Sequence, residues 1–96
     1  MKIRLVPEAE ADVADAYAWY KERNELLATA FLDAIGAALT AIARHPHAFP
    51  RVHKDVRRAL ARRFPYGIFA LLPDEVVVLA CFHVARDPKS WPRRAR

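Results

Sequence analysis

Residues Val76–His83 read VVVLACFH, a run of side chains that stays apolar up to its last position. Successive side chains of a strand point to opposite faces, so a strand that is apolar at every position must be covered on both faces. A run of this length also suits a strand better than a helix. We therefore predict a central strand here, with other elements packed on each side of it.

The residues before this run predict further strands joined by turns. Residues 56–63 form one predicted strand, which contains four arginines, and residues 68–72 form another. Residues 64–67, Phe-Pro-Tyr-Gly, predict a bend between them, and residues 73–75 predict a tight turn before the central strand. Residues 45–52 contain two prolines and little periodicity, which predicts an irregular connection over the surface.

Two helices are predicted further towards the N-terminus. Pro7 suits the first helical position, and helical periodicity continues from there to about residue 23. Asn24 then predicts a break, and a second apolar stripe runs on until Pro46. So short a join predicts an antiparallel helical hairpin. Gly36, inside the second helix, predicts a close approach of the first helix. The stripe consists of Leu27, Phe31, Ile35, Ala38, Leu39 and Ile42.

The length and composition predict one folded domain over residues 1–96. The chain is 54% hydrophobic, which is too apolar for a disordered segment, and its lone Cys81 excludes an internal disulfide. A short strand is predicted over residues 2–6. The order strand, helix, helix, strand, strand, strand predicts an α+β domain, in which a helical hairpin covers one face of a small, largely antiparallel sheet that includes a three-stranded meander. We expect Cys81 to be an unreactive core thiol in a soluble cytoplasmic protein without membrane contact.

Charge is concentrated in the middle of the chain. The net charge is −3 over residues 1–43, +6 over residues 44–63 and +2 over residues 64–96. Twelve of the sixteen basic residues are arginines, whose planar guanidinium pairs with phosphate or carboxylate through two hydrogen bonds. This distribution predicts an anionic partner that meets the arginines on one accessible face of the sheet.

Short motifs along the chain carry a resemblance to a known family. Most of the chain, from about residue 7 to residue 94, resembles toxins of the RelE/ParE superfamily from bacterial type II toxin–antitoxin modules. The resemblance implies the small α+β fold and a cognate antitoxin protein that holds the toxin inactive in a hetero-oligomer. The motifs are Trp19-Tyr20, Phe31-Leu32, Pro46, Arg57-Arg58, Phe64-Pro65-Tyr66 with Ile68, and His83-Val84-Ala85-Arg86-Asp87-Pro88 with Trp91 and Arg94.

The resemblance implies one of two activities. RelE-like toxins cut mRNA on the ribosome, whereas ParE-like toxins inhibit DNA gyrase. Metal-free RNA cleavage needs a proton donor and cations around the phosphate, for which the candidates are His83, Arg58, Arg62 and Arg86. The chain lacks the C-terminal tyrosine of many RelE-like toxins, because its last tyrosine is Tyr66. The His-x-x-Arg-Asp-Pro ending is also more similar to ParE, so gyrase inhibition is the leading hypothesis and mRNA cleavage the alternative.

The candidate target-binding residues are basic or aromatic. An antitoxin that covers them is expected to be acidic, with an apolar helix or strand. We expect no cofactor and no metal, since the three histidines of residues 45–53 lack a consistent ligand spacing. The candidates are Arg57, Arg58, Arg62, Arg63, Arg86, Trp91, Arg93 and Arg94.

Simpler interpretations stay open. The arginines could form an ordinary solvated face, and His83 could make a structural hydrogen bond to a loop. The domain could also be an inactive module that keeps the fold without the toxicity.

Overall fold

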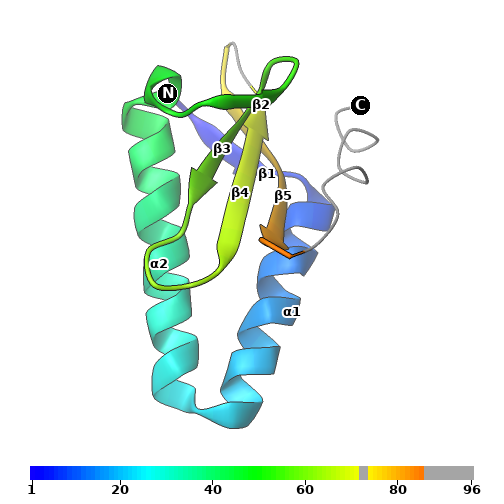
Figure 1. The fold of residues 1–96 in the computed structure, drawn as a ribbon, viewed down its shortest axis with the longest axis vertical. Helices are drawn as coiled ribbons and strands as arrows, with labels where there is room; N and C mark the ends of the chain where they lie inside the picture. The colour runs from blue at the N-terminus through cyan, green and yellow to red at the C-terminus, as the bar shows by residue number, and fades with distance from the viewer. Residues whose placement is uncertain (72–73, 86–96) are drawn as a thin grey trace.

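A computed structural model describes residues 1–71 and 74–85, and it shows a helical hairpin packed on a mixed five-stranded sheet (Figure 1). The predicted α+β class is confirmed. The strand order is β1-β5-β4-β3-β2, with β1 parallel to β5 and every other pair antiparallel. The elements are β1 (Ile3–Leu5), α1 (Pro7–Arg23), α2 (Glu25–Arg44), the 3-10 helix η1 (Pro46–Ala48), β2 (Arg51–His53), β3 (Val56–Leu60), β4 (Tyr66–Leu71) and β5 (Val76–His83).

The structure corrects several predicted boundaries. The connection expected over residues 45–52 contains η1 and most of the edge strand β2, so the prediction of an irregular segment is wrong there. The strand expected over residues 56–63 ends at Leu60, and β4 already begins at Tyr66, inside the predicted bend. The central strand is confirmed, because β5 lies between β1 and β4.

Asn24 joins the two helices and caps both of them. Its backbone N–H donates to the carbonyl of Tyr20 at 2.8 Å, which closes the last turn of α1. Its side-chain oxygen accepts the N–H groups of Leu26 at 2.9 Å and Leu27 at 3.3 Å, which satisfies two of the unpaired donors at the start of α2. One residue therefore sets the sharp reversal of the hairpin.

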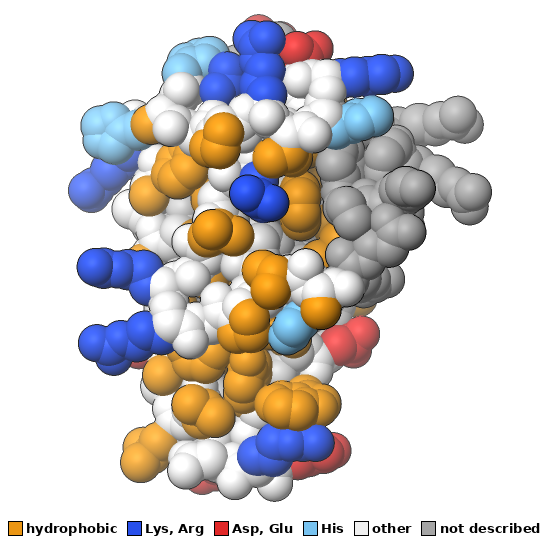
Figure 2. Space-filling model, in the orientation of Figure 1, with side chains coloured by type: hydrophobic (Ala, Val, Ile, Leu, Met, Phe, Trp, Pro, Cys, Tyr) orange, Lys and Arg blue, Asp and Glu red, His pale blue; other side chains and the backbone are white. Residues whose placement is uncertain are grey.

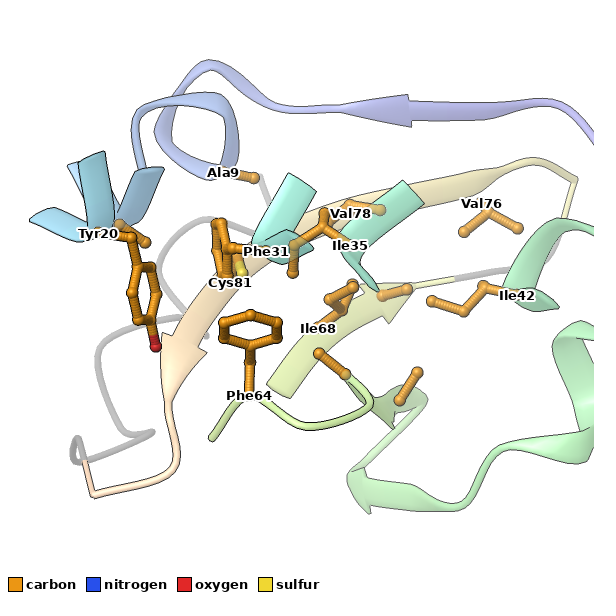
Figure 3. Close-up of a cluster of buried hydrophobic side chains, with 14 of the residues drawn as sticks. Ala9, Tyr20, Phe31, Ile35, Ile42, Phe64, Ile68, Val76, Val78 and Cys81 are labelled. Atoms are coloured by element: carbon orange, nitrogen blue, oxygen red, sulfur yellow. The ribbon is translucent and has the colours of Figure 1, made fainter. Parts of the chain in front are cut away.

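The helices bury one face of the sheet around Phe31 (Figure 3). The Phe31 ring is fully buried, and its centroid lies 5.1 Å from Tyr20, 5.5 Å from Phe64 and 5.2 Å from Tyr66. These spacings are typical of edge-to-face and tilted aromatic packing. The aromatic cluster therefore connects α1 and α2 to the start of β4.

A bulge in β5 decides which side chains face the helices. Ile68 of β4 pairs with Cys81 and Ala70 pairs with Val78, so β5 contains one residue more than β4 between these two pairs. Val78 and Cys81 both pack in the cluster that contains the helices, while Leu79 and Ala80 pack in a second cluster on the other face. The bulge thus shifts the alternation of side chains by one residue, so that Cys81 faces the helices.

Helix α2 is more apolar than α1, and by length and composition alone it could cross a membrane. In this fold, Phe31, Ile35 and Ile42 bury its apolar stripe against the rest of the domain. The prediction for Gly36 is wrong: the glycine is exposed, and a Cβ atom at this position would have nothing within 4 Å. Its place in the helix therefore owes nothing to contact with α1.

The cap predicts the effect of Asn24→Ala. The substitution removes the acceptor for two N–H groups and lowers the free energy of unfolding by about 1 kcal/mol. Urea unfolding followed by circular dichroism measures the change. Asn24→Asp keeps a carboxylate acceptor and serves as the matched control, so an equal loss in both variants would contradict the role of the cap.

Candidate functional site

The predicted arginine surface is divided between the two faces of the sheet. Arg57 lies on the helix side, since its neighbour two positions on, Ala59, packs in the helix-side cluster. Its guanidinium donates to the carbonyl of Phe49 at 2.7 Å and more weakly to that of His47 at 3.4 Å. Arg57 therefore fastens the η1 segment to the sheet, and the expectation that Arg57 and Arg58 share one face is wrong.

Arg58 is exposed on the opposite face of the sheet. Its cross-strand partner Phe69 packs in the second cluster together with Val56. The aliphatic part of Arg58 lies across Gly67, where a Cβ atom would be 3.4 Å from Cδ of Arg58. The glycine lets the arginine lie flat over β4, and its guanidinium makes no ion pair with any carboxylate that the structure describes.

Arg62 and Arg63 lie beyond β3, in the connection to β4. Both side chains are exposed, and Arg63 adopts a positive φ of 69°. With Phe64 they line a groove of about 610 Å³ against Ala30, Asp33 and Ala34 of α2. This pair belongs to a third surface, beside α2. The other predicted residues, Arg86, Trp91, Arg93 and Arg94, lie outside the described residues.

A cleft of about 690 Å³ opens between the helical hairpin and the ends of β4 and β5. This cleft is not among the predicted sites, although its α1 residues recur at helical spacing from Asp12 to Arg23, which is the one signal of it in the sequence. The cleft is lined by Asp12, Asp15, Ala16, Trp19, Tyr20, Arg23, Leu27, Pro65, Tyr66, Cys81 and His83.

His83 lines this cleft, away from Arg58 on the outer side of the sheet and from Arg62 beside α2. Its Nδ1 atom accepts the backbone N–H of Ala85 at 3.0 Å, which is the structural hydrogen bond expected as the simpler interpretation. An Nδ1 atom that accepts a hydrogen bond carries no proton, so in the neutral ring the proton resides on Nε2. The ring lies edge-on to Tyr66, with 5.4 Å between centroids.

Aromatic side chains form one wall of the cleft. Trp19 is half exposed, as predicted, and Tyr20 is buried beside it at 5.1 Å between ring centroids. The Arg23 guanidinium stacks 3.5 Å above the Trp19 ring and donates to the Trp19 carbonyl at 2.7 Å. Burial raises the pKa of Tyr20 and of Tyr66, and for Tyr66 the neighbouring Tyr20 and Cys81 raise it further. Both phenols are therefore neutral at physiological pH.

Asp12 connects α1 to β5 at the inner end of the cleft. One of its carboxylate oxygens accepts the backbone N–H of Cys81 at 3.0 Å. The thiol itself is buried, and burial, together with the charge of Asp12, raises its pKa to about 12. Cys81 is therefore protonated and unreactive at neutral pH, as predicted.

Comparison with known proteins identifies relatives of this domain. A family model described as the ParE toxin of the type II toxin–antitoxin system parDE matches residues 3–88. A solved structure of the chromosomal ParDE toxin–antitoxin system from P. aeruginosa superposes with a TM-score of 0.76 at 17% sequence identity. The superposition covers 86% of this chain and 95% of the solved one. A comparison with curated proteins finds no match.

The raised pKa of Cys81 predicts alkaline destabilisation. The thiol ionises near its ordinary value of 9.0 when unfolded but near 12 when folded, so its contribution is full below about pH 9 and is lost as the pH rises towards 12. We expect the free energy of unfolding to fall over this range, as urea titrations at increasing pH would measure. Cys81→Ala removes the thiol and its smaller effect on the pKa of Tyr66, whereas the burial that raises the pKa of both tyrosines stays, so this variant should show a smaller fall. An identical pH dependence in both proteins would contradict the assignment.

Proposed function

From the premise that the chain belongs to the ParE toxin family of type II toxin–antitoxin systems, we propose that it arrests growth by inhibiting DNA gyrase. The observation that supports this proposal is the separation of His83, Arg58 and Arg62, three of the four candidates for mRNA cleavage; the fourth, Arg86, lies outside the described residues. Family membership implies a cognate antitoxin as a partner, and the proposal adds the target.

Cleavage of RNA requires a proton donor and cations within hydrogen-bonding reach of one phosphate. His83 lies in the cleft on the helix side of the sheet, whereas Arg58 lies on the opposite face and Arg62 lines the groove beside α2. A single phosphate group could therefore not contact all three side chains at once. This geometry favours a toxin that acts by binding.

The cleft around His83 is also a poor site for a polyanion. Asp12 and Asp15 contribute two carboxylates to its lining, and Arg23 is the one cation there from the described part of the chain. Carboxylates repel a phosphate backbone, which needs an excess of positive charge along its path. The mRNA cleavage alternative therefore finds little support at this surface.

Assays with purified gyrase test the proposal directly. The toxin should inhibit DNA supercoiling and increase the amount of cleaved DNA, while mapping of transcript 5′ ends after induction should show intact messages. Cuts phased with codons, with unchanged supercoiling, would establish the nuclease instead. Loss of growth arrest, together with normal gyrase activity, would identify an inactive module.

Neutralisation is proposed to be mainly occlusion by the antitoxin. The surfaces to be covered differ in chemistry, since Arg58 needs a carboxylate partner while Trp19 and Leu27 of the cleft need apolar contacts. An acidic antitoxin with an apolar segment supplies both. Copurification of the toxin with the product of an adjacent gene would identify this partner.

His83→Gln separates the two activities. Glutamine keeps an acceptor for the Ala85 N–H but cannot transfer a proton, so a nuclease that used His83 would slow by about 10²- to 10⁴-fold. A gyrase inhibitor should remain toxic, with supercoiling inhibition within about twofold of the unaltered protein. Growth curves and the supercoiling assay measure these outcomes, and near-complete loss of toxicity in a folded His83→Gln protein would contradict the proposal.

A further inference from the structure

The face of the sheet opposite the helices is here called the outer face, and on it the described residues of β3 and β4 place one exposed arginine in apolar surroundings. On β3 it presents Val56, Arg58 and Leu60, and their β4 partners Leu71, Phe69 and Gly67 lie beside them. Figure 2 shows hydrophobic side chains gathered over this part of the molecule, with basic side chains set singly among and around them. The helices cover none of these β3 side chains, because they pack on the other face.

Arg58 is available to a partner. Its guanidinium has neither a hydrogen bond nor an ion pair with any residue in the described part of the chain. Leu60, two positions away on the same face, is 57% exposed. Gly67 is the cross-strand partner of Leu60 and has no side chain, which leaves a shallow depression beside the leucine. The aliphatic part of the Arg58 side chain borders this depression.

This composition fits a protein better than a nucleic acid. Binding to a phosphate backbone needs several cations along one face. Within the described part of β3, Arg58 stands alone on the outer face, because Arg57 is turned to the helix side and is held by backbone carbonyls. A single arginine with apolar neighbours is typical of an energetically dominant contact in a protein interface, where surrounding apolar contacts exclude water. Its complement is a carboxylate set among apolar side chains.

We propose that the outer face is where the target protein docks, with Arg58 paired to a carboxylate of the target and Leu60 in apolar contact beside it. This inference rests on the proposed function, since the target is taken to be DNA gyrase. The aliphatic part of Arg58 packs over Gly67, which limits the positions that its guanidinium can adopt. Less side-chain conformational entropy is therefore lost when Arg58 binds a partner.

Binding of purified toxin variants to purified gyrase, measured by calorimetry without DNA, tests the docking face. Arg58→Ala should weaken binding by about 10- to 30-fold, and Leu60→Ser by about three- to tenfold. Arg58→Lys keeps the charge but not the planar fork, so it should fall between Arg58→Ala and the unaltered toxin. Arg44→Ala removes an exposed arginine from the end of α2 and is the matched control, which should bind within about twofold.

Each result bears on a separate claim. If the unaltered toxin neither binds gyrase nor inhibits supercoiling, the proposed function and the docking face are both wrong. If it binds, but Arg58→Ala and Leu60→Ser bind equally well, only the docking face is wrong. Binding that requires DNA and weakens equally in Arg58→Ala and Arg44→Ala would indicate a phosphate partner and overturn the inference. Circular dichroism checks that each variant is folded, and the three altered side chains, Arg44, Arg58 and Leu60, are all exposed.

Discussion

The bulge in β5 is the constraint on which the rest of the structure depends. Without it, strict alternation from Val76 and Val78 would turn Cys81 and His83 away from the helices. With it, the same strand supplies the core at one end and the cleft at the other. Because β1 pairs with only residues 76–78, the later part of β5 has no strand on that side, and Asp12 of α1 supplies the acceptor for the Cys81 N–H. A polar contact between helix and sheet thus replaces the missing strand.

The elements could be predicted from the sequence because they are determined by local chemistry. The unbroken apolar run of β5, the proline that opens α1 and the asparagine between the helices each act within a few residues of themselves. Strand β2 gave no such signal, since its three exposed residues depend on pairing with β3. The sequence gives no sign of the bulge either, because VVVLACFH is apolar on both sides of the bulge and would fit either alternation of faces. Which face His83 occupies therefore had to come from the structure.

The candidate site was harder to predict because charge density along a chain is not charge density on a surface. Seven basic residues in twenty suggested one cationic face. Alternation alone separates Arg57 from Arg58, and the early end of β3 at Leu60 moves Arg62 and Arg63 out of the sheet. The predicted contact at Gly36 was wrong for a related reason. A glycine leaves space for a neighbouring element, but no other part of the protein occupies the space beside Gly36. The cleft was missed because its lining comes from four separate elements.

The separation of surfaces also restricts how the toxin can be neutralised. The cleft and Arg58 lie on opposite sides of the same sheet, so a compact inhibitor seated in the cleft would leave the outer face open. An inhibitor in the cleft could otherwise act on Arg58 only by changing the arrangement of the sheet. The fully buried Phe31 and Ile68, which pack between the helices and the sheet, favour a single arrangement. Occlusion then requires a partner that extends around an edge of the sheet. The edge at β2 is the shorter route to Arg58, because β2 is next to β3, and its exposed backbone and basic side chains are suited to an extended acidic segment.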